Sequence, residues 1–130
     1  SIATMSLFKK NTVVENDYKQ KYTLEERLVE SNRILTKHVD RIPVILSKLS
    51  GANIPEIEKR RYLIPSQYNV AQLIHIIRTR LNISEEKGIF IFVNGTIVPR
   101  PNEKMFELYC REKDEDQFLY ITYCYENTFG

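Results

Sequence analysis

The sequence contains no tryptophan, and it has only two cysteines and four glycines among its 130 residues. Cys110 and Cys124 are too few for a disulfide framework. Neither they nor His38 and His75 have the clustered spacing of a zinc site. Apolar runs fall far short of the ~20 residues that span a bilayer, and the first residues lack the layout of a secretory signal. The sequence therefore predicts a cytoplasmic protein with no metal site and no cofactor.

Catalytic motifs are missing as well. No G-x-S-x-G sequence, phosphate loop or dinucleotide fingerprint occurs. Cys110 stands among apolar residues, where a buried structural thiol is expected rather than a nucleophile. We predict that the protein is not an enzyme. Its length and its 42% hydrophobic and 28% charged residues are those of one ordinary globular domain.

Positive charge is concentrated in the first half of the chain. Up to Ile64 there are twelve Lys and Arg against eight Asp and Glu, whereas the remainder has seven against nine. Nucleic-acid binding through Lys59, Arg60 and Arg61 is one hypothesis. Three cations are few for such a site, however, and no aromatic platform accompanies them on the same strand. We therefore predict no nucleic-acid partner.

A helix is predicted to begin after Thr23, because Thr23 and Glu26 have the spacing of a capping box. Four residues then recur at helical spacing and form a stripe that must pack on a core built downstream. They are Leu24, Leu28, Ser31 and Leu35.

Strands and further helices follow along the chain. Residues 41–48 and 59–65 read as two paired strands, the second at the sheet edge because Lys, Arg and Pro65 protect exposed edges. The clearest helix spans 70–81, with an apolar stripe at Val70, Leu73, Ile74, Ile77 and Leu81. The remaining elements are a strand at 88–93 that enters an Asn94-Gly95 turn, the start of a return strand cut short by Pro99 and Pro101, a short helix at 104–110 and a final strand at 117–125.

This order predicts an α+β fold, the ubiquitin-like β-grasp, with a four-stranded mixed sheet, a central helix and an N-terminal helical extension. A ferredoxin-like split βαβ would need a helix between the first two strands, and only a short connection fills that gap. We expect a flexible N-terminal segment at 1–17, the ubiquitin-like domain at 18–125 and a flexible C-terminal tail at 126–130.

The edge strand has two possible roles. Its charges can simply block aggregation. Alternatively, an extended peptide can add itself to the free backbone groups and place alternate side chains in pockets on either side. Periodicity alone leaves both open.

Several segments resemble the autophagy-related protein 8 family, and the resemblance runs from about Leu24 to Gly130. They are "DRIPVILSK", "KRRYLIPS", "IFIFVNGTIVP", "LYCREKDEDQFLYITY" and the terminal Phe129-Gly130. The resemblance implies a ubiquitin-like modifier in autophagosome formation, monomeric before conjugation. A processing protease, an activating enzyme and a conjugating enzyme would act on Gly130 to form an amide with phosphatidylethanolamine. The protein would then be associated with the autophagosome membrane.

The resemblance also implies docking of receptor peptides that carry an aromatic-x-x-aliphatic motif. An aromatic pocket carries over to Glu30, Ile34, Pro43, Arg61, Leu63 and Phe118. An aliphatic pocket carries over to Tyr62, Ile64, Pro65, Tyr68, Leu73 and Ile76. Arg41 and Arg80 match positions associated with acidic residues beside the motif. Val39 and Gln117 depart from the family pattern. The alternative is a ubiquitin-like interaction domain that is not conjugated and uses only the edge strand.

Overall fold

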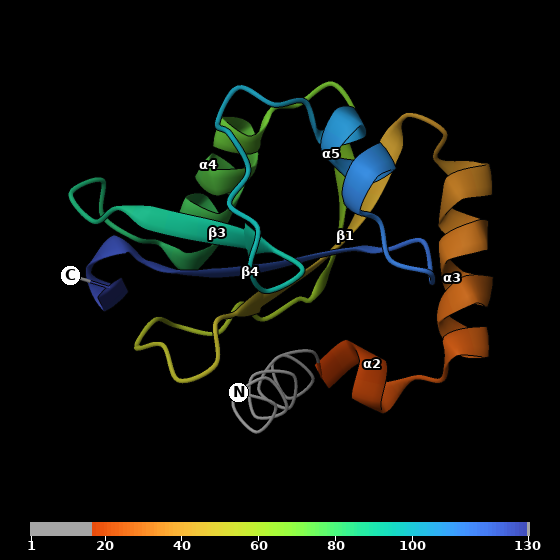
Figure 1. The fold of residues 1–130 in the computed structure, drawn as a ribbon, viewed down its shortest axis with the longest axis horizontal. Coiled ribbons are helices and arrows are strands. Elements are labelled where there is room, and N and C mark those ends of the chain that lie inside the picture. The colour runs from red at the N-terminus through yellow and green to blue at the C-terminus, as the bar shows by residue number, and fades with distance from the viewer. Residues whose placement is uncertain (1–16, 130) are drawn as a thin grey trace, which may run out of the picture.

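The chain folds around a four-stranded mixed sheet in the order β2-β1-β4-β3 (Figure 1). The computed structural model describes residues 17–129. Its strands are β1 (Arg41–Lys48), β2 (Arg61–Pro65), β3 (Ile89–Val93) and β4 (Leu119–Tyr125). Strands β1 and β4 run parallel, and the other neighbours are antiparallel. The helices are α2 (Asp17–Lys21), α3 (Leu24–Lys37), α4 (Val70–Leu81) and α5 (Met105–Glu112), followed by a 3-10 turn, η1 (Glu126–Phe129).

This topology confirms the predicted β-grasp. Strands β1 and β2 form an antiparallel hairpin with no helix between them, which rules out the split βαβ. The expected N-terminal flexible segment lies outside the described residues, except that Asp17 begins α2. At the other end, residues 126–129 form η1 and Gly130 lies outside the described residues. The flexibility of the tail stays a prediction.

Helix α3 begins as predicted but buries a different face. Thr23 Oγ1 accepts from the Glu26 backbone N–H at 3.2 Å, and the Thr23 N–H donates to Glu26 Oε1 at 3.0 Å. The buried residues are Arg27, Ser31 and Ile34, so only Ser31 of the predicted stripe is buried. The prediction followed apolar residues and missed Arg27, whose charge is compensated inside the protein.

The two faces of the sheet carry separate apolar clusters. Ile42, Val44 and Leu46 of β1 point to the larger cluster, which contains the inner faces of α4 and α5. Ile45 points to the opposite face and packs with three residues from other elements, Ile34, Phe118 and Tyr120. Figure 1 accordingly shows α4 and α5 on one side of the sheet, with α2 on the other and α3 at one end. Successive side chains of a strand point to opposite faces of the sheet, and β1 is buried from residue 42 to residue 47, so it contributes to both clusters.

The hairpin connecting β1 and β2 is tied to the core by one hydroxyl. Tyr123 on β4 accepts from the Ile57 N–H at 2.7 Å and donates to the Pro55 carbonyl at 2.9 Å. The connection also buries three of its own apolar side chains, those of Ala52, Ile54 and Ile57. These contacts fix where the chain enters the edge strand.

Turn chemistry sets the element boundaries that the sequence placed approximately. Asn94 and Gly95 have φ of 53° and 79°, which confirms the predicted turn with two left-handed residues. The last strand begins at Leu119 instead of 117, because Gln117 has φ of 73° and belongs to a turn closed by a 2.9 Å bond from its N–H to the Asp114 carbonyl.

Cys110 is exposed, so its predicted burial is wrong, while Cys124 is buried.

Tyr109 makes the fold sensitive to alkaline pH. Its hydroxyl donates to the Gln117 carbonyl at 2.7 Å, and burial raises the pKa of Tyr109 to about 12. A raised pKa means that the stabilisation is complete below the ordinary tyrosine pKa and is lost as pH rises from about 10 to 12. Tyr109→Phe should therefore be less stable than the parent at pH 7, by about 1 kcal/mol for the lost hydrogen bond. Urea titrations at pH 7, 10 and 12 should show this difference shrinking; a constant difference would contradict it.

Candidate docking edge and C-terminal tail

Strand β2 is an edge of the sheet, as predicted, and its pairing register aims backbone groups outward. The Leu46 N–H bonds the Arg60 carbonyl and the Ser66 N–H bonds the Asp40 carbonyl, so even-numbered β1 residues form the hydrogen-bonded pairs. Leu63 faces Pro43 in a non-hydrogen-bonded pair. The Leu63 N–H and C=O therefore point away from β1, which is the geometry that an added strand needs.

A groove of about 390 Å³ lies on the α4 side of this edge. Every residue predicted for the aliphatic pocket lines it except Leu73, which is fully buried in the core. The full lining is Arg41, Tyr62, Leu63, Ile64, Pro65, Tyr68, His75, Ile76, Thr79 and Arg80. Sequence reasoning missed His75 and Thr79, although each directly precedes a predicted site residue on α4, Ile76 or Arg80. The groove is therefore lined by apolar residues such as Ile64 and by polar side chains of α4, His75 and Thr79.

Cations stand at the rim of the groove. Arg80 lies 5.8 Å from the centre of the Tyr62 ring, and Lys59 lies 5.5 Å from the same ring. Arg41 is exposed and reaches the outward-facing Leu63 carbonyl at 3.4 Å. A ligand with acidic side chains near its aliphatic residue would meet positive charge here.

The residues predicted for the aromatic pocket meet on the opposite face of β2. Ile34 and Phe118 are fully buried at its floor, and Leu63 packs on them. At the rim, Arg61 Nη1 lies 2.7 Å from Glu30 Oε1. Hydrogen bonding from Arg33 holds the pKa of Glu30 below its ordinary value against the effect of burial, and the charge of Arg61 adds to this. Glu30 is therefore ionised and paired with Arg61 in the region predicted for the aromatic pocket.

Helix α2 brings a further aromatic residue to this floor. The Tyr18 ring lies 5.4 Å from the Phe118 ring in an edge-on arrangement, and it packs on the cluster that contains Leu63. No motif in the sequence marked Tyr18. Its contacts depend on tertiary structure, because Phe118 is a hundred residues away along the chain.

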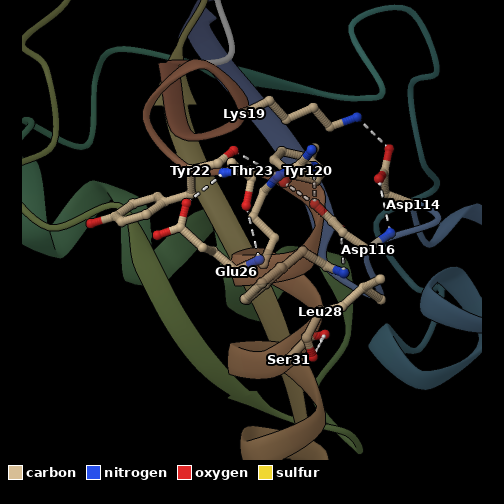
Figure 2. Close-up of polar contacts among 11 residues, drawn as sticks. Lys19, Tyr22, Thr23, Glu26, Leu28, Ser31, Asp114, Asp116 and Tyr120 are labelled. Carbon is tan, nitrogen blue, oxygen red and sulfur yellow. Dashed lines mark hydrogen bonds and ion pairs between the residues drawn. The ribbon is translucent and has the colours of Figure 1, made fainter.

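A buried polar network joins the N-terminal helices to the loop before β4 (Figure 2). Asp116 is fully buried and lies 2.6 Å from Arg27 Nη1 of α3. Its carboxylate also accepts from the Phe118 N–H at 2.8 Å and from the Tyr120 hydroxyl. Nearby, Lys19 of α2 pairs with Asp114 of the same loop. These bonds position both α2 and α3 beside the docking edge.

The network also fixes the protonation of its members. Burial alone would lower the pKa of Arg27, but hydrogen bonds to Asp116 and Tyr120 raise it. Burial and the bond to Asp116 raise the pKa of Tyr120 far above its ordinary value. Arg27 is thus a cation and Tyr120 a neutral donor around neutral pH.

The C-terminal turn leaves the sheet at a different end of the molecule. Glu126 N–H bonds the Gly88 carbonyl at 2.9 Å, and a Cβ on Gly88 would lie 2.1 Å from Glu126 Cδ. This close approach seats the first residue of η1 beside β3. Figure 1 shows η1 at the end of the molecule opposite α3. A partner at the tail and a peptide near α3 would therefore occupy separate surfaces.

Residues 17–129 contain neither a metal-binding cluster nor a membrane-spanning helix. No group of three or more His, Cys, Asp or Glu side chains in that range is placed to hold a metal ion. No helix in the same range has both the length and the apolar character needed to cross a bilayer.

Comparisons with known proteins give one consistent family. The family described as "Autophagy protein Atg8 ubiquitin like" matches residues 26–130. Autophagy-related protein 8B of Oryza sativa is 46% identical over 118 residues, which cover 91% of this chain and 98% of that protein. Autophagy-related protein 8 of Vanderwaltozyma polyspora is 47% identical over 90% of this chain and 98% of its own. The crystal structure of Trypanosoma brucei ATG8 has a TM-score of 0.81 at 34% identity, covering 87% of this chain and 97% of that one.

Proposed function

Because the chain belongs to the Atg8 family of ubiquitin-like autophagy proteins, we propose that it is a modifier joined through Gly130 to phosphatidylethanolamine. The observation that carries this proposal is that the family match extends through residue 130. In the proposed sequence a protease exposes the Gly130 carboxyl group, an activating enzyme uses ATP to form a thioester and a conjugating enzyme receives the acyl group. The lipid amine then attacks the thioester carbonyl, and the cysteine thiol leaves. The chain itself is the substrate of these enzymes and not a catalyst.

Phosphatidylethanolamine would convert a cytoplasmic protein into one held on the autophagosome membrane. Each buried CH₂ contributes ~0.8 kcal/mol, and a single acyl chain holds a protein only marginally, whereas two chains anchor it stably. A glycine suits the transferred position because it lacks a Cβ and can thread a narrow channel in an extended conformation. The position of η1 away from α3 supports simultaneous lipid attachment and receptor capture.

We also propose that β2 docks receptor peptides by strand addition, with an aromatic residue and an aliphatic residue on either side. The outward Leu63 backbone, the apolar groove beside α4 and the Ile34–Phe118 floor support this role. An aromatic side chain burying ~200 Å² at ~25 cal/mol/Å², together with a leucine, gives roughly 7 kcal/mol before association costs. Micromolar affinity is expected after those costs, and avidity on a membrane would raise it.

A reconstituted conjugation reaction tests the modifier role. The protein is incubated with activating and conjugating enzymes, ATP and liposomes containing phosphatidylethanolamine. We expect a lipid adduct with faster gel mobility and the mass of protein plus lipid minus water, absent without ATP or with phosphatidylcholine alone. If the enzymes convert a known substrate in the same tube but leave this protein unchanged, the conjugation proposal is wrong and the interaction-domain alternative is favoured.

Leu63→Ala tests the docking role. The truncation removes apolar surface shared by both pockets, so binding of a labelled aromatic-x-x-Leu peptide should weaken about tenfold, or 1.4 kcal/mol. Fluorescence anisotropy measures the change. Val98→Ala is the matched control, because Val98 is 62% exposed and lies outside the residues assigned to the edge. Equal affinities for parent and Leu63→Ala would remove β2 from the docking site.

A further inference from the structure

Tyr18 lies where the proposed aromatic pocket has its floor. Its ring meets Phe118 edge-on at 5.4 Å with an interplanar angle of 71°, and it packs on the cluster of Ile34, Ile45, Phe118 and Tyr120. Leu63 of the edge strand packs on the same cluster. An aromatic side chain of this protein therefore already makes the contacts that an incoming aromatic residue would seek.

Arg61 connects Tyr18 to the rim of the pocket. Its guanidinium lies 2.7 Å from Glu30 Oε1. Burial raises the pKa of Tyr18 although a hydrogen bond with Arg61 lowers it. Tyr18, Glu30 and Arg61 therefore interact with one another, and a ligand whose aromatic residue packs on Phe118 must displace the contact of Tyr18 with that ring.

Helix α2 contacts the domain through side chains that are half-buried or exposed. It has only five residues and none of them is buried. A helix this short is not stable by itself, so its place depends on its contacts with the domain. Two of these are ion pairs, Lys19 with Asp114 and Asp17 with Arg60, the latter at 3.0 Å. Both pairs include partly exposed side chains, so water screens their attraction.

Space is available beside Tyr18 for its ring to move. A cavity of about 390 Å³ is lined by Asp17, Tyr18 and Lys21 of α2, by Tyr22 just after this helix, and by residues 58–61, which lead into β2. A rotated Tyr18 side chain would remain in contact with aromatic and cationic groups there. This cavity could receive the Tyr18 ring when it leaves Phe118.

We propose that Tyr18 is an intramolecular occupant of the aromatic pocket, so that α2 is an autoinhibitory lid and the aromatic residue of a receptor peptide competes with Tyr18. This inference depends on the docking role proposed above. The pocket is competent only in the fraction of molecules whose Tyr18 has moved away, and the apparent Kd is the intrinsic Kd divided by that fraction. Removing the ring should therefore tighten binding.

The test compares variants against one labelled peptide of the form Trp-x-x-Leu by fluorescence anisotropy. Tyr18→Ala is expected to lower the Kd about five- to tenfold, as it would if the open fraction of the parent is about 10–20%. The double variant Asp17→Ala/Lys19→Ala keeps the ring but removes both ion pairs, and it should shift the Kd in the same direction. Phe90→Ala is the matched control, because it removes an exposed aromatic ring on β3, at the opposite edge of the sheet, and its Kd should stay near that of the parent.

The outcomes separate this inference from the docking proposal. If Tyr18→Ala binds no more tightly than the parent while Leu63→Ala weakens binding, β2 docks the peptide but Tyr18 is not a competitor. A weaker Tyr18→Ala complex, with an unchanged thermal unfolding midpoint, would make Tyr18 a wall of the pocket and overturn the lid. If no variant binds the peptide above background, both proposals are wrong.

Discussion

Asp116→Asn is expected to lower the free energy of unfolding by about 3–5 kcal/mol, because it leaves the buried Arg27 charge without its counter-ion. The Asp116 side chain is fully buried and that of Arg27 is 10% exposed. The carboxylate accepts from Arg27, from the Phe118 N–H and from the Tyr120 hydroxyl. An amide has one acceptor oxygen in place of two and cannot balance a cation. Urea titration monitored by circular dichroism measures the loss.

Glu115→Gln provides the matched control for this prediction. It makes the same chemical change one residue earlier, at an exposed side chain of the same loop. Surface substitutions of this kind usually change stability by about 0.5 kcal/mol or less. If the urea midpoint of Asp116→Asn lies as close to the parent as that of Glu115→Gln, the buried pair does not stabilise the fold.

Local signals in the sequence were sufficient for most of the fold. The capping box at Thr23, the Asn94-Gly95 turn and the period-2 and period-3.6 apolar patterns each describe neighbours within a few residues. Their spacing fixes which groups can meet, whatever the rest of the chain does. The edge position of β2 was also readable, since protective charges and Pro65 occur on the strand itself.

Long-range polar pairing could not be read in the same way. The predicted stripe ran through Leu24 and Leu28 and did not include Arg27, which the structure buries. Its burial depends on Asp116, a residue 89 positions away, and no local pattern links the two. Tyr18 was missed for the same reason, because its importance arises from a ring that approaches only after the sheet has formed.

Some residues of the candidate site were predicted from the sequence, and others became visible only in the structure. The resemblance supplied residues on both sides of β2, and the structure brings them together in two places that share Leu63. It does not supply His75 or Thr79, which line the groove in this chain. Along α4, side chains that line the groove alternate with side chains that face solvent. The amino-acid type alone does not predict which of the two a residue will be.

Gly130→Ala is expected to abolish formation of the phosphatidylethanolamine adduct in the reconstituted reaction. The reacting carbonyl belongs to residue 130, and an added Cβ stands directly beside the path of the attacking thiol or amine. A misplacement of about 1 Å at a reacting centre can cost 10²-fold in rate, which would take the product below detection. Gel mobility and intact mass measure the adduct, and trapping of the enzyme thioesters shows which transfer fails.

Two controls limit the interpretation of that result. Asn127→Ala alters the exposed turn η1 without touching the reacting carbonyl, and it should form the adduct at a rate near that of the parent. Gly130→Ala should bind the aromatic-x-x-Leu peptide with the affinity of the parent, since the edge strand β2 and the end of β4 lie apart. If Gly130→Ala still yields a lipid adduct, a glycine at residue 130 is not required, and fragment masses of the adduct then show whether the lipid is joined to the carboxyl group of residue 130. A lipid found on a side-chain carboxylate would make that group the acyl donor and overturn the terminal-glycine mechanism.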